Sequence, residues 1–453
     1  MRLRTLSMSI RHWPVLLVLL LMLVPGADAR AQARPSVFEV ELGHGVSPAA
    51  ASFATRAVRE ATAANATALV IVVSGDGGVL RAAWSLAREI ADAEIPVVVW
   101  LGPGSVEGGA AGALLLAAAN VAAVAPGATA GFALPLAQSP AGFSLQTQQL
   151  VRDEVVRELA GWQRERGRNV EWIERAARDG AIIEAEAALE TDPPVFDTVV
   201  TTREELLTTL ANRRVQLAAG DTRVLQTLGA AVVEVRPSFL ESLAQTLAIP
   251  TVAFVCFVLG AIALYLELAN PGTSVPGVAG AVLVAGALYG FFQADARPIA
   301  VLMLAGGLGI AALEHIAPSH GGLTLAGVLL LAGGALYLVD PARAPGLAVA
   351  PSVIVGSALA LGLAALGLFA VATRTRVRRP STGTEALVGQ VAEVRQQLDP
   401  EGMVFVGGAL WSAWSDQGPF HPGELVEVAG VENLRLYVRR LDSVLESEMK
   451  GSL

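Results

Sequence analysis

Five apolar runs between residues 248 and 372 set the strongest constraint on the fold of this 453-residue chain. Each run is close to the roughly 20 residues that a helix needs to cross the hydrocarbon core of a membrane. Lipid also favours helices, because a helix satisfies its own backbone polar groups. We therefore expect a helical membrane domain over residues 245–373. The predicted spans lie near residues 248–268, 275–293, 297–314, 322–339 and 351–372.

The N-terminal segment has the pattern of a secretory signal peptide. Arginines precede the apolar core VLLVLLLMLV, and PGADARAQA with its small residues follows. This order predicts a signal peptide over residues 1–31 that is cleaved after Ala29 or Ala31, and an uncleaved anchor is the alternative. In both cases the next segment is placed outside the cytoplasmic membrane.

Residues 35–236 alternate between short β-rich runs and amphipathic helical runs. The β-rich runs lie at residues 37–43, 68–74, 96–101 and 121–126. This order predicts parallel βαβ units. A longer helical pattern extends from about Gln146 to Arg178. We expect one α/β domain here.

The C-terminal part, residues 383–442, changes to alternating β patterns broken by DPEG and HPGE turns. Several short strands within so few residues predict a small β-barrel. The basic cluster RTRVRR lies between the last apolar run and this domain. Because positive charge concentrates on the cytoplasmic side of membrane proteins, the barrel is expected in the cytoplasm.

Charge and cysteine content exclude several classes of function. A net charge of -9 disfavours polyanion binding, so we expect no nucleic-acid partner despite Trp411 and Trp414 in the predicted barrel. Cys256 is the single cysteine. It allows no disulfide within the chain and disfavours a cysteine-based metal site. We predict neither a metal site nor a cofactor.

Five stretches in this order resemble the NfeD family, membrane proteins whose long form joins a ClpP-class serine-protease-like domain to a membrane block and an OB-fold domain. The stretches are SGDGG, AGALLLAAANVAAVAPG, RGRNVEWIERAARDGAIIEAEAALE, LYLELANPGTSVPG and ALVGQVAEVRQQLDPEGMVFVGGALWSA. The resemblance implies an α/β ClpP/crotonase-like exported domain, then a multi-span helical domain, then a small all-β OB-fold domain.

The resemblance implies a catalytic pattern that active members of the family share. A nucleophilic serine lies in an A-S-A-G stretch before the apolar helix, and a lysine further along the chain is its base. The AG and APG landmarks place the serine position at Ala110, in GAAG. The lysine position falls at about Leu150, and the only lysine of the chain is Lys450. An alanine methyl group is no nucleophile, and arginine stays protonated, so it is a poor base. We expect no catalytic Ser-Lys pair.

Replacement residues for the missing pair are few. Ser105 and Ser74 lie in loops near the expected site, and His44 is the single histidine of residues 35–236. These residues form either a rebuilt serine–histidine site or an ordinary set of turn serines and a solvated histidine. We prefer the second interpretation. The loop with Gly75, Gly77 and Gly78 aligns with the oxyanion-side loop of the family. It is interpreted either as a peptide-binding loop or as a tight turn of the fold, and Asp76 makes it more negative.

Two functions follow from these expectations. The first is a membrane-anchored protein with a degenerate, non-catalytic protease-like domain. It acts as a scaffold or peptide-binding partner of stomatin- or flotillin-like membrane proteins, and it is a candidate homo-oligomer. The second is an active membrane-bound serine endopeptidase with a replacement nucleophile such as Ser105. We prefer the first, because both members of the expected catalytic pair are missing.

Overall fold

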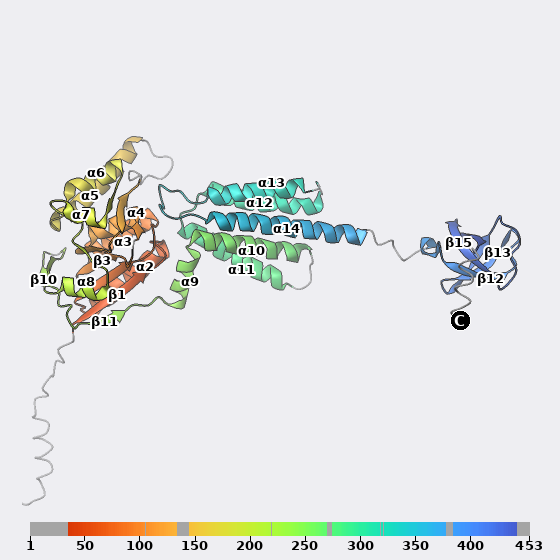
Figure 1. Cartoon of the computed structure of the whole chain (residues 1–453), viewed down its shortest axis with the longest axis horizontal. Coiled ribbons are helices and arrows are strands. Elements are labelled where there is room, and N and C mark those ends of the chain that lie inside the picture. The colour runs from red at the N-terminus through yellow and green to blue at the C-terminus, as the bar shows by residue number, and fades with distance from the viewer. Residues whose placement is uncertain are drawn as a thin grey trace, which may run out of the picture. The chain divides into compact units, whose positions relative to one another are not determined.

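The computed structural model describes residues 35–104, 106–133, 145–218, 220–269, 274–317, 319, 321–376 and 384–441. The chain divides into two compact units, Met1–Leu363 and Ala364–Leu453. The first unit holds the α/β domain and most of the membrane helices, and the second holds a barrel (Figure 1). The predicted signal peptide lies outside the described residues.

A six-stranded parallel sheet forms the centre of the α/β domain. Its strand order is β11-β1-β2-β3-β5-β8, and every neighbouring pair in it is parallel. The strands are β1 Ser36–Leu42, β2 Ala68–Val73, β3 Val97–Leu101, β5 Val121–Val124, β8 Thr198–Val199 and β11 Ala231–Glu234. Parallel neighbours require crossover connections, so the predicted βαβ units are confirmed.

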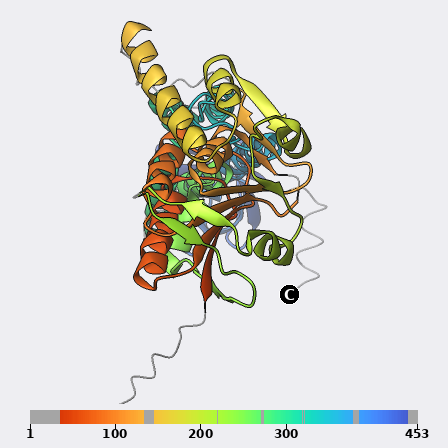
Figure 2. The same ribbon diagram turned by 90° about the vertical axis from the view of Figure 1, so that its left-hand side faces the viewer.

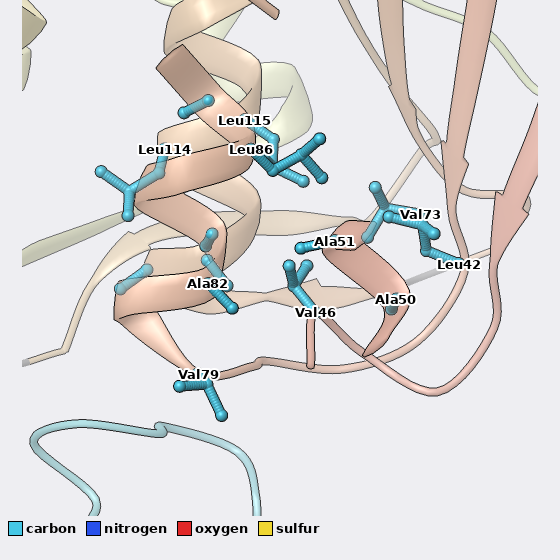
Figure 3. Close-up of a cluster of buried hydrophobic side chains, with 14 of the residues drawn as sticks. Leu42, Val46, Ala50, Ala51, Val73, Val79, Ala82, Leu86, Leu114 and Leu115 are labelled. Atoms are coloured by element: carbon cyan, nitrogen blue, oxygen red, sulfur yellow. The ribbon is translucent and has the colours of Figure 1, made fainter. Parts of the chain in front are cut away.

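Helices cover both faces of this sheet (Figure 2). Helices α2 Pro48–Ala63, α3 Leu80–Ala91 and α4 Gly109–Ala118 bury their apolar faces against one side, and α8 Arg203–Leu210 packs on the other. The strand side chains alternate between the two clusters: Ile71 and Val73 join the first, and Val70 and Val72 join the second. A strand covered on both faces reads as a continuous apolar run, which is how ALVIVV appears in the sequence. Figure 3 shows part of the first cluster.

The helical pattern predicted over residues 146–178 forms two helices rather than one. Helix α5 spans Leu145–Glu165 and helix α6 spans Val170–Asp179. Gly167 lies between them with a φ of +66°, a conformation that favours glycine. Asn169 then caps α6, and its side chain accepts the backbone N–H of Trp172 at 2.9 Å. The break sets the direction of the segment between these helices, which carries two arginines described below.

Smaller elements complete the α/β domain. They are the sheet β4 Glu107–Gly108, β6 Thr129–Phe132 and β7 Ala181–Glu184, the helix α7 Ala185–Glu190, and the hairpin β9 Arg214–Gln216 with β10 Thr222–Val224. Strand β4 directly precedes helix α4 and pairs with β6. This pairing fixes the backbone that leads into α4.

Helix α9 Phe239–Leu247 links the α/β domain to the membrane helices. Ser238 and Glu241 form a capping box at its start. Two guanidinium nitrogens of Arg56 on α2 donate to the Glu241 carboxylate, both at 2.8 Å. These hydrogen bonds lower the pKa of Glu241 to about 2. The ion pair ties α9 to the α/β domain.

One helix occupies each of the five predicted apolar runs. They are α10 Pro250–Ala269, α11 Val275–Gln293, α12 Pro298–Ile316, α13 Gly322–Leu336 and α14 Pro351–Arg376. Among the described residues, the stretches Pro250–Glu267 and Val275–Gln293 are long and apolar enough to cross a membrane by length and composition. The apolar stretches of the other three helices are shorter.

Close glycine contacts hold the membrane helices together as two hairpins, α10 with α11 and α12 with α13. A Cβ atom added to Gly280 would lie 2.7 Å from the carbonyl oxygen of Gly260. One added to Gly327 would lie 2.4 Å from the carbonyl oxygen of Gly307. Small residues at such positions let helix backbones approach closely in lipid. In both hairpins, glycines therefore let the two helix backbones approach closely.

The second unit contains a closed barrel with the strand order β12-β13-β14-β16-β15. The strands are β12 Val391–Gln396, β13 Glu401–Val406, β14 Ala409–Trp414, β15 Leu425–Glu432 and β16 Arg435–Arg440. Strands β14 and β16 pair in parallel and the other neighbours are antiparallel. A five-stranded barrel of this kind is an OB fold, so the predicted all-β domain is confirmed.

Candidate functional site

The expected position of the nucleophile lies at the N-terminal end of helix α4. Gly109 begins the helix with a φ of +54°, and Ala110 follows it. A Cβ atom on Gly108 would lie 2.7 Å from a terminal methyl group of Leu101, so a larger residue there would require the Leu101 side chain to shift. The Ala110 side chain is 5% exposed and offers only a methyl group. The helix start is present without a nucleophile at this position.

The glycine loop after β2 has its amide donors engaged within the chain. The N–H of Gly75 donates to the carbonyl of Leu42 at 3.3 Å, and that of Gly77 donates to Glu107 at 3.2 Å. The N–H of Gly78 donates to the carbonyl of Pro345 at 3.1 Å. An oxyanion hole needs donors that are free to meet the developing charge. In this arrangement the three glycine amides already have acceptors.

Asp76 adds a carboxylate to the same loop. Its Oδ1 atom accepts the backbone N–H of Glu107 at 3.0 Å, so it holds the loop against the strand that leads into α4. The side chain is exposed, and Glu107 beside it is exposed as well. Two carboxylates disfavour an oxyanion at this point. The electrostatics therefore suit a neutral or positively charged group.

The replacement residues do not assemble into a nucleophile and base among the described residues. The Ser74 hydroxyl donates to Oε1 of Glu41 at 2.7 Å. His44 lies exposed in the turn between β1 and α2. Ser105 lies outside the described residues. The structure thus gives Ser74 a carboxylate partner and places His44 at the surface.

The expected position of the base lies on helix α5. Leu150 is 64% exposed there, whereas Val156 and Leu159 of the same helix are buried in the core. The leucine side chain has no group that can accept a proton. Arg152, two residues further on, carries a guanidinium group, which is a poor general base. No residue at this position provides a general base.

Two arginines of the RGRN segment, Arg166 and Arg168, contact the other end of α4. Arg166 donates to the carbonyls of Ala118 and Ala119 at 2.7 and 2.8 Å. Arg168 donates to Leu116 and Ala119 at 2.9 and 2.8 Å. These contacts satisfy carbonyls at the helix C-terminus, where cations are also favoured by the helix dipole. The RGRN segment therefore fixes the position of α4.

Arg166 and Arg168 are largely removed from solvent, which disfavours their charged forms. Burial lowers the pKa of Arg166 to about 10 and also lowers the pKa of Arg168. Asp197 compensates the charge, because its Oδ2 atom accepts from Arg168 at 2.6 Å and from the backbone N–H of Ala122 at 2.7 Å. Arg213 also donates to this carboxylate. The network joins α4, β5 and the segment that leads into β8.

Within the part of the chain that the structure describes, no group of three or more His, Cys, Asp or Glu side chains has the arrangement of a metal site. The contacts of the glycine loop are made largely by backbone groups. The extended segment at Gly78 pairs in parallel with Val46 on one side, and on its other side the N–H groups of Gly78 and Leu80 donate to the carbonyls of Pro345 and Arg343. Such an edge binds an extended chain through carbonyl groups.

Comparison with known proteins identifies two domains. Residues 251–372 match the NfeD integral membrane domain, and residues 384–440 match the NfeD-like C-terminal, partner-binding domain. The chain is 28% identical over 389 residues to the membrane-bound protease PH1510 of Pyrococcus horikoshii, covering 83% of this chain and 87% of that protein. The present chain is thus a membrane protein that carries both NfeD domains.

Two solved structures from Pyrococcus horikoshii are also similar to parts of the chain. One is the 1510-N membrane protease specific for a stomatin homolog, at 20% identity and a TM-score of 0.39, covering 47% of this chain and 97% of that chain. The other is the C-terminal domain of stomatin operon partner protein 1510-C, at 40% identity and a TM-score of 0.13, covering 14% of this chain and 98% of that chain.

Proposed function

Because the chain carries the NfeD integral membrane domain and the NfeD C-terminal domain, we propose that it is a membrane-anchored NfeD-like protein whose protease-like domain does not cleave peptides. The domain instead acts as a scaffold or peptide-binding module. One observation carries this proposal: the helix start that would present a serine presents the buried methyl group of Ala110. The general base is missing as well, since Lys450 is the only lysine.

The proposed partner is a stomatin- or flotillin-like membrane protein. The C-terminal domain matches a partner-binding family, and a similar structure is described as a stomatin operon partner protein.

We place the α/β domain outside the cytoplasmic membrane and the barrel in the cytoplasm, with the boundaries 35–236, 245–373 and 383–442. The RTRVRR cluster before the barrel supports this orientation.

We also propose a homo-oligomer, for which crosslinking in native membranes is the test. Recovery of monomers alone would refute it.

A fluorophosphonate probe tests the catalytic half of the proposal. The full-length protein in lipid nanodiscs is treated with the probe beside the double variant Ala110→Ser, Leu150→Lys, and any label is located by mass spectrometry. We expect no label on the native chain. Label on the double variant would show that the site accepts the missing pair. Label at Ser105 of the native chain would refute the proposal and support an active endopeptidase.

A reconstitution experiment tests the partner half. The full-length protein and a purified stomatin-like protein are placed in the same nanodiscs, and their association is measured by single-molecule colocalisation. A variant that lacks residues 384–453 serves as the comparison, since it retains the membrane helices. We expect association with the full chain and its loss in the shortened one. Equal association of both would refute the assignment of partner binding to the barrel.

A further inference from the structure

A loop of the membrane region lies against the glycine loop of the α/β domain. It comprises residues 340–347, with the sequence DPARAPGL, and connects α13 to α14. The N–H of Gly78 donates to the carbonyl of Pro345 at 3.1 Å, and the N–H of Leu80 donates to the carbonyl of Arg343 at 2.8 Å. Figure 3 shows Val79, between these two donors, directed toward the pale blue-green loop. We call residues 340–347 the strap loop.

The two hydrogen bonds have the order of an antiparallel strand pair, because the donor changes from Gly78 to Leu80 while the acceptor changes from Pro345 back to Arg343. Unlike in a regular antiparallel pair, the strap loop donates no hydrogen bond in return. Pro345 has no N–H to return, and the N–H of Arg343 donates to Asp340 within the loop at 2.9 Å. All donors therefore belong to the α/β domain and all acceptors to the strap loop. An extended peptide binds an exposed strand edge through the same kind of main-chain contact.

Glycines on both sides let the two backbones meet. A Cβ atom on Gly77 would lie 2.0 Å from the carbonyl oxygen of Pro345. A Cβ atom on Gly346 would lie 3.1 Å from the Cα atom of Gly77. Gly77 and Gly346 have φ angles of +62° and +81°, which favour glycine. The fit depends on the strap loop as much as on the glycine loop.

The strap loop and the residues that directly follow it are bound to the starts of two membrane helices. Asp340 pairs with Arg297 at the start of α12, with 3.1 Å between the charged atoms. The hydroxyl of Thr251, at the start of α10, accepts the backbone N–H of Ala350 at 3.0 Å. Ala344 is fully buried between these attachments. A shift of these helices therefore moves the strap loop.

We propose that the strap loop is an internal occupant of a backbone-binding edge formed by Gly78 and Leu80, and that an extended peptide binds this edge only when the loop leaves. This inference rests on the proposed function, since it names the site at which the α/β domain binds a peptide and the segment that controls access. The membrane helices regulate the site, because they hold the strap loop. The ligand class is an extended polypeptide recognised through consecutive carbonyl groups.

Hydrogen exchange at single-residue resolution tests the proposal in the full-length protein in nanodiscs. We expect slow exchange at the Gly78 and Leu80 amides of the native chain. In the variant Gly346→Val, exchange at both amides should accelerate by about tenfold or more, because a β-branched residue is strained at this φ and meets Gly77. Gly321→Val is the matched control. Gly321 lies in another membrane loop with a φ of +96° and open space around it.

A second arm adds the synthetic peptide DPARAPGL, with blocked ends, to the Gly346→Val variant at about 1 mM, the effective concentration typical of a tethered segment. We expect the peptide to restore slow exchange at Gly78. Fast exchange in the native chain, no acceleration in the variant, or failure of the peptide to restore protection would each overturn the proposal. These results are independent of fluorophosphonate labelling, so a failure here is distinguishable from a failure of the proposed function.

Discussion

Removal of the Arg168 guanidinium gives the sharpest test of how helix α4 is held. The side chain is 1% exposed, and it donates to the carbonyls of Leu116 and Ala119 and to Asp197. The substitution Arg168→Leu removes these donors while it retains apolar volume. The carbonyls of Leu116 and Ala119 then lack the Arg168 donor, and the buried carboxylate of Asp197 loses one of its positively charged partners.

The size of the effect follows from these contacts. Breaking a buried ion pair by removing one partner costs about 3 to 5 kcal/mol of folding free energy. Each buried carbonyl left without a donor costs about 1 to 3 kcal/mol. Asp197 keeps its contacts with Arg213 and the N–H of Ala122, which reduces the cost. Arg166 still donates to Ala119. We therefore expect a loss of about 3 kcal/mol, the lower end of the range for a broken pair.

Pulse proteolysis of the full-length protein in nanodiscs, over a urea series, measures the unfolding of the α/β domain. Arg164→Leu is the matched control, because Arg164 is an exposed arginine in the last turn of α5, four residues before Arg168. Arg168→Lys should fall between the native protein and Arg168→Leu, since a lysine has no planar fork to reach two carbonyls and a carboxylate at once. A difference below about 0.5 kcal/mol between Arg168→Leu and Arg164→Leu, the usual range of surface substitutions, would refute the reasoning.

Three further predictions concern other parts of the chain. Glu241→Gln should cost about 1 kcal/mol at neutral pH; because the folded pKa of Glu241 is lowered to about 2 from an ordinary value of 4.5, the difference from the native protein in thermal unfolding should vanish as the pH falls between these values. Gly327→Val should weaken the second membrane hairpin, whereas Gly309→Val, with open space around it, should not, as measured by detergent-induced unfolding. In the barrel, Leu436→Ala should cost about 2 to 4 kcal/mol and the exposed Leu410→Ala little, measured by urea unfolding.

Much of the fold follows from local patterns in the sequence. The run ALVIVV is apolar throughout because both faces of β2 are covered, and it therefore reads as a buried strand. The membrane helices follow from the length of their apolar runs. The barrel strands follow from alternation and from the turns between them. In each case a segment carries its own signal, and its partners are close in the sequence or are given by the order of the elements.

The contacts around the candidate site depend on segments that are far apart, and no local pattern specifies them. The sequence places DPARAPGL between two predicted membrane spans, but it does not show that Pro345 accepts from Gly78. RGRN carries two arginines that resemble surface charges, yet Arg168 is buried against Asp197. The sequence shows that Asp76 makes the glycine loop more negative, but it does not show the contact of its carboxylate with the Glu107 amide, which gives Asp76 a structural role. Tertiary packing decides each of these cases.

The glycine loop itself has a structural explanation that needs no catalysis. A Cβ atom on Gly75 would lie 2.2 Å from the nitrogen of Gly45, and one on Gly78 would lie 2.7 Å from the nitrogen of Val46. These clashes demand glycine wherever the turn after β2 packs against the turn after β1. The motif SGDGG therefore indicates the fold and its backbone-binding edge, and it carries no information about a nucleophile. The resemblance places the serine position at Ala110 and the lysine position at about Leu150, and neither side chain is a nucleophile or a base.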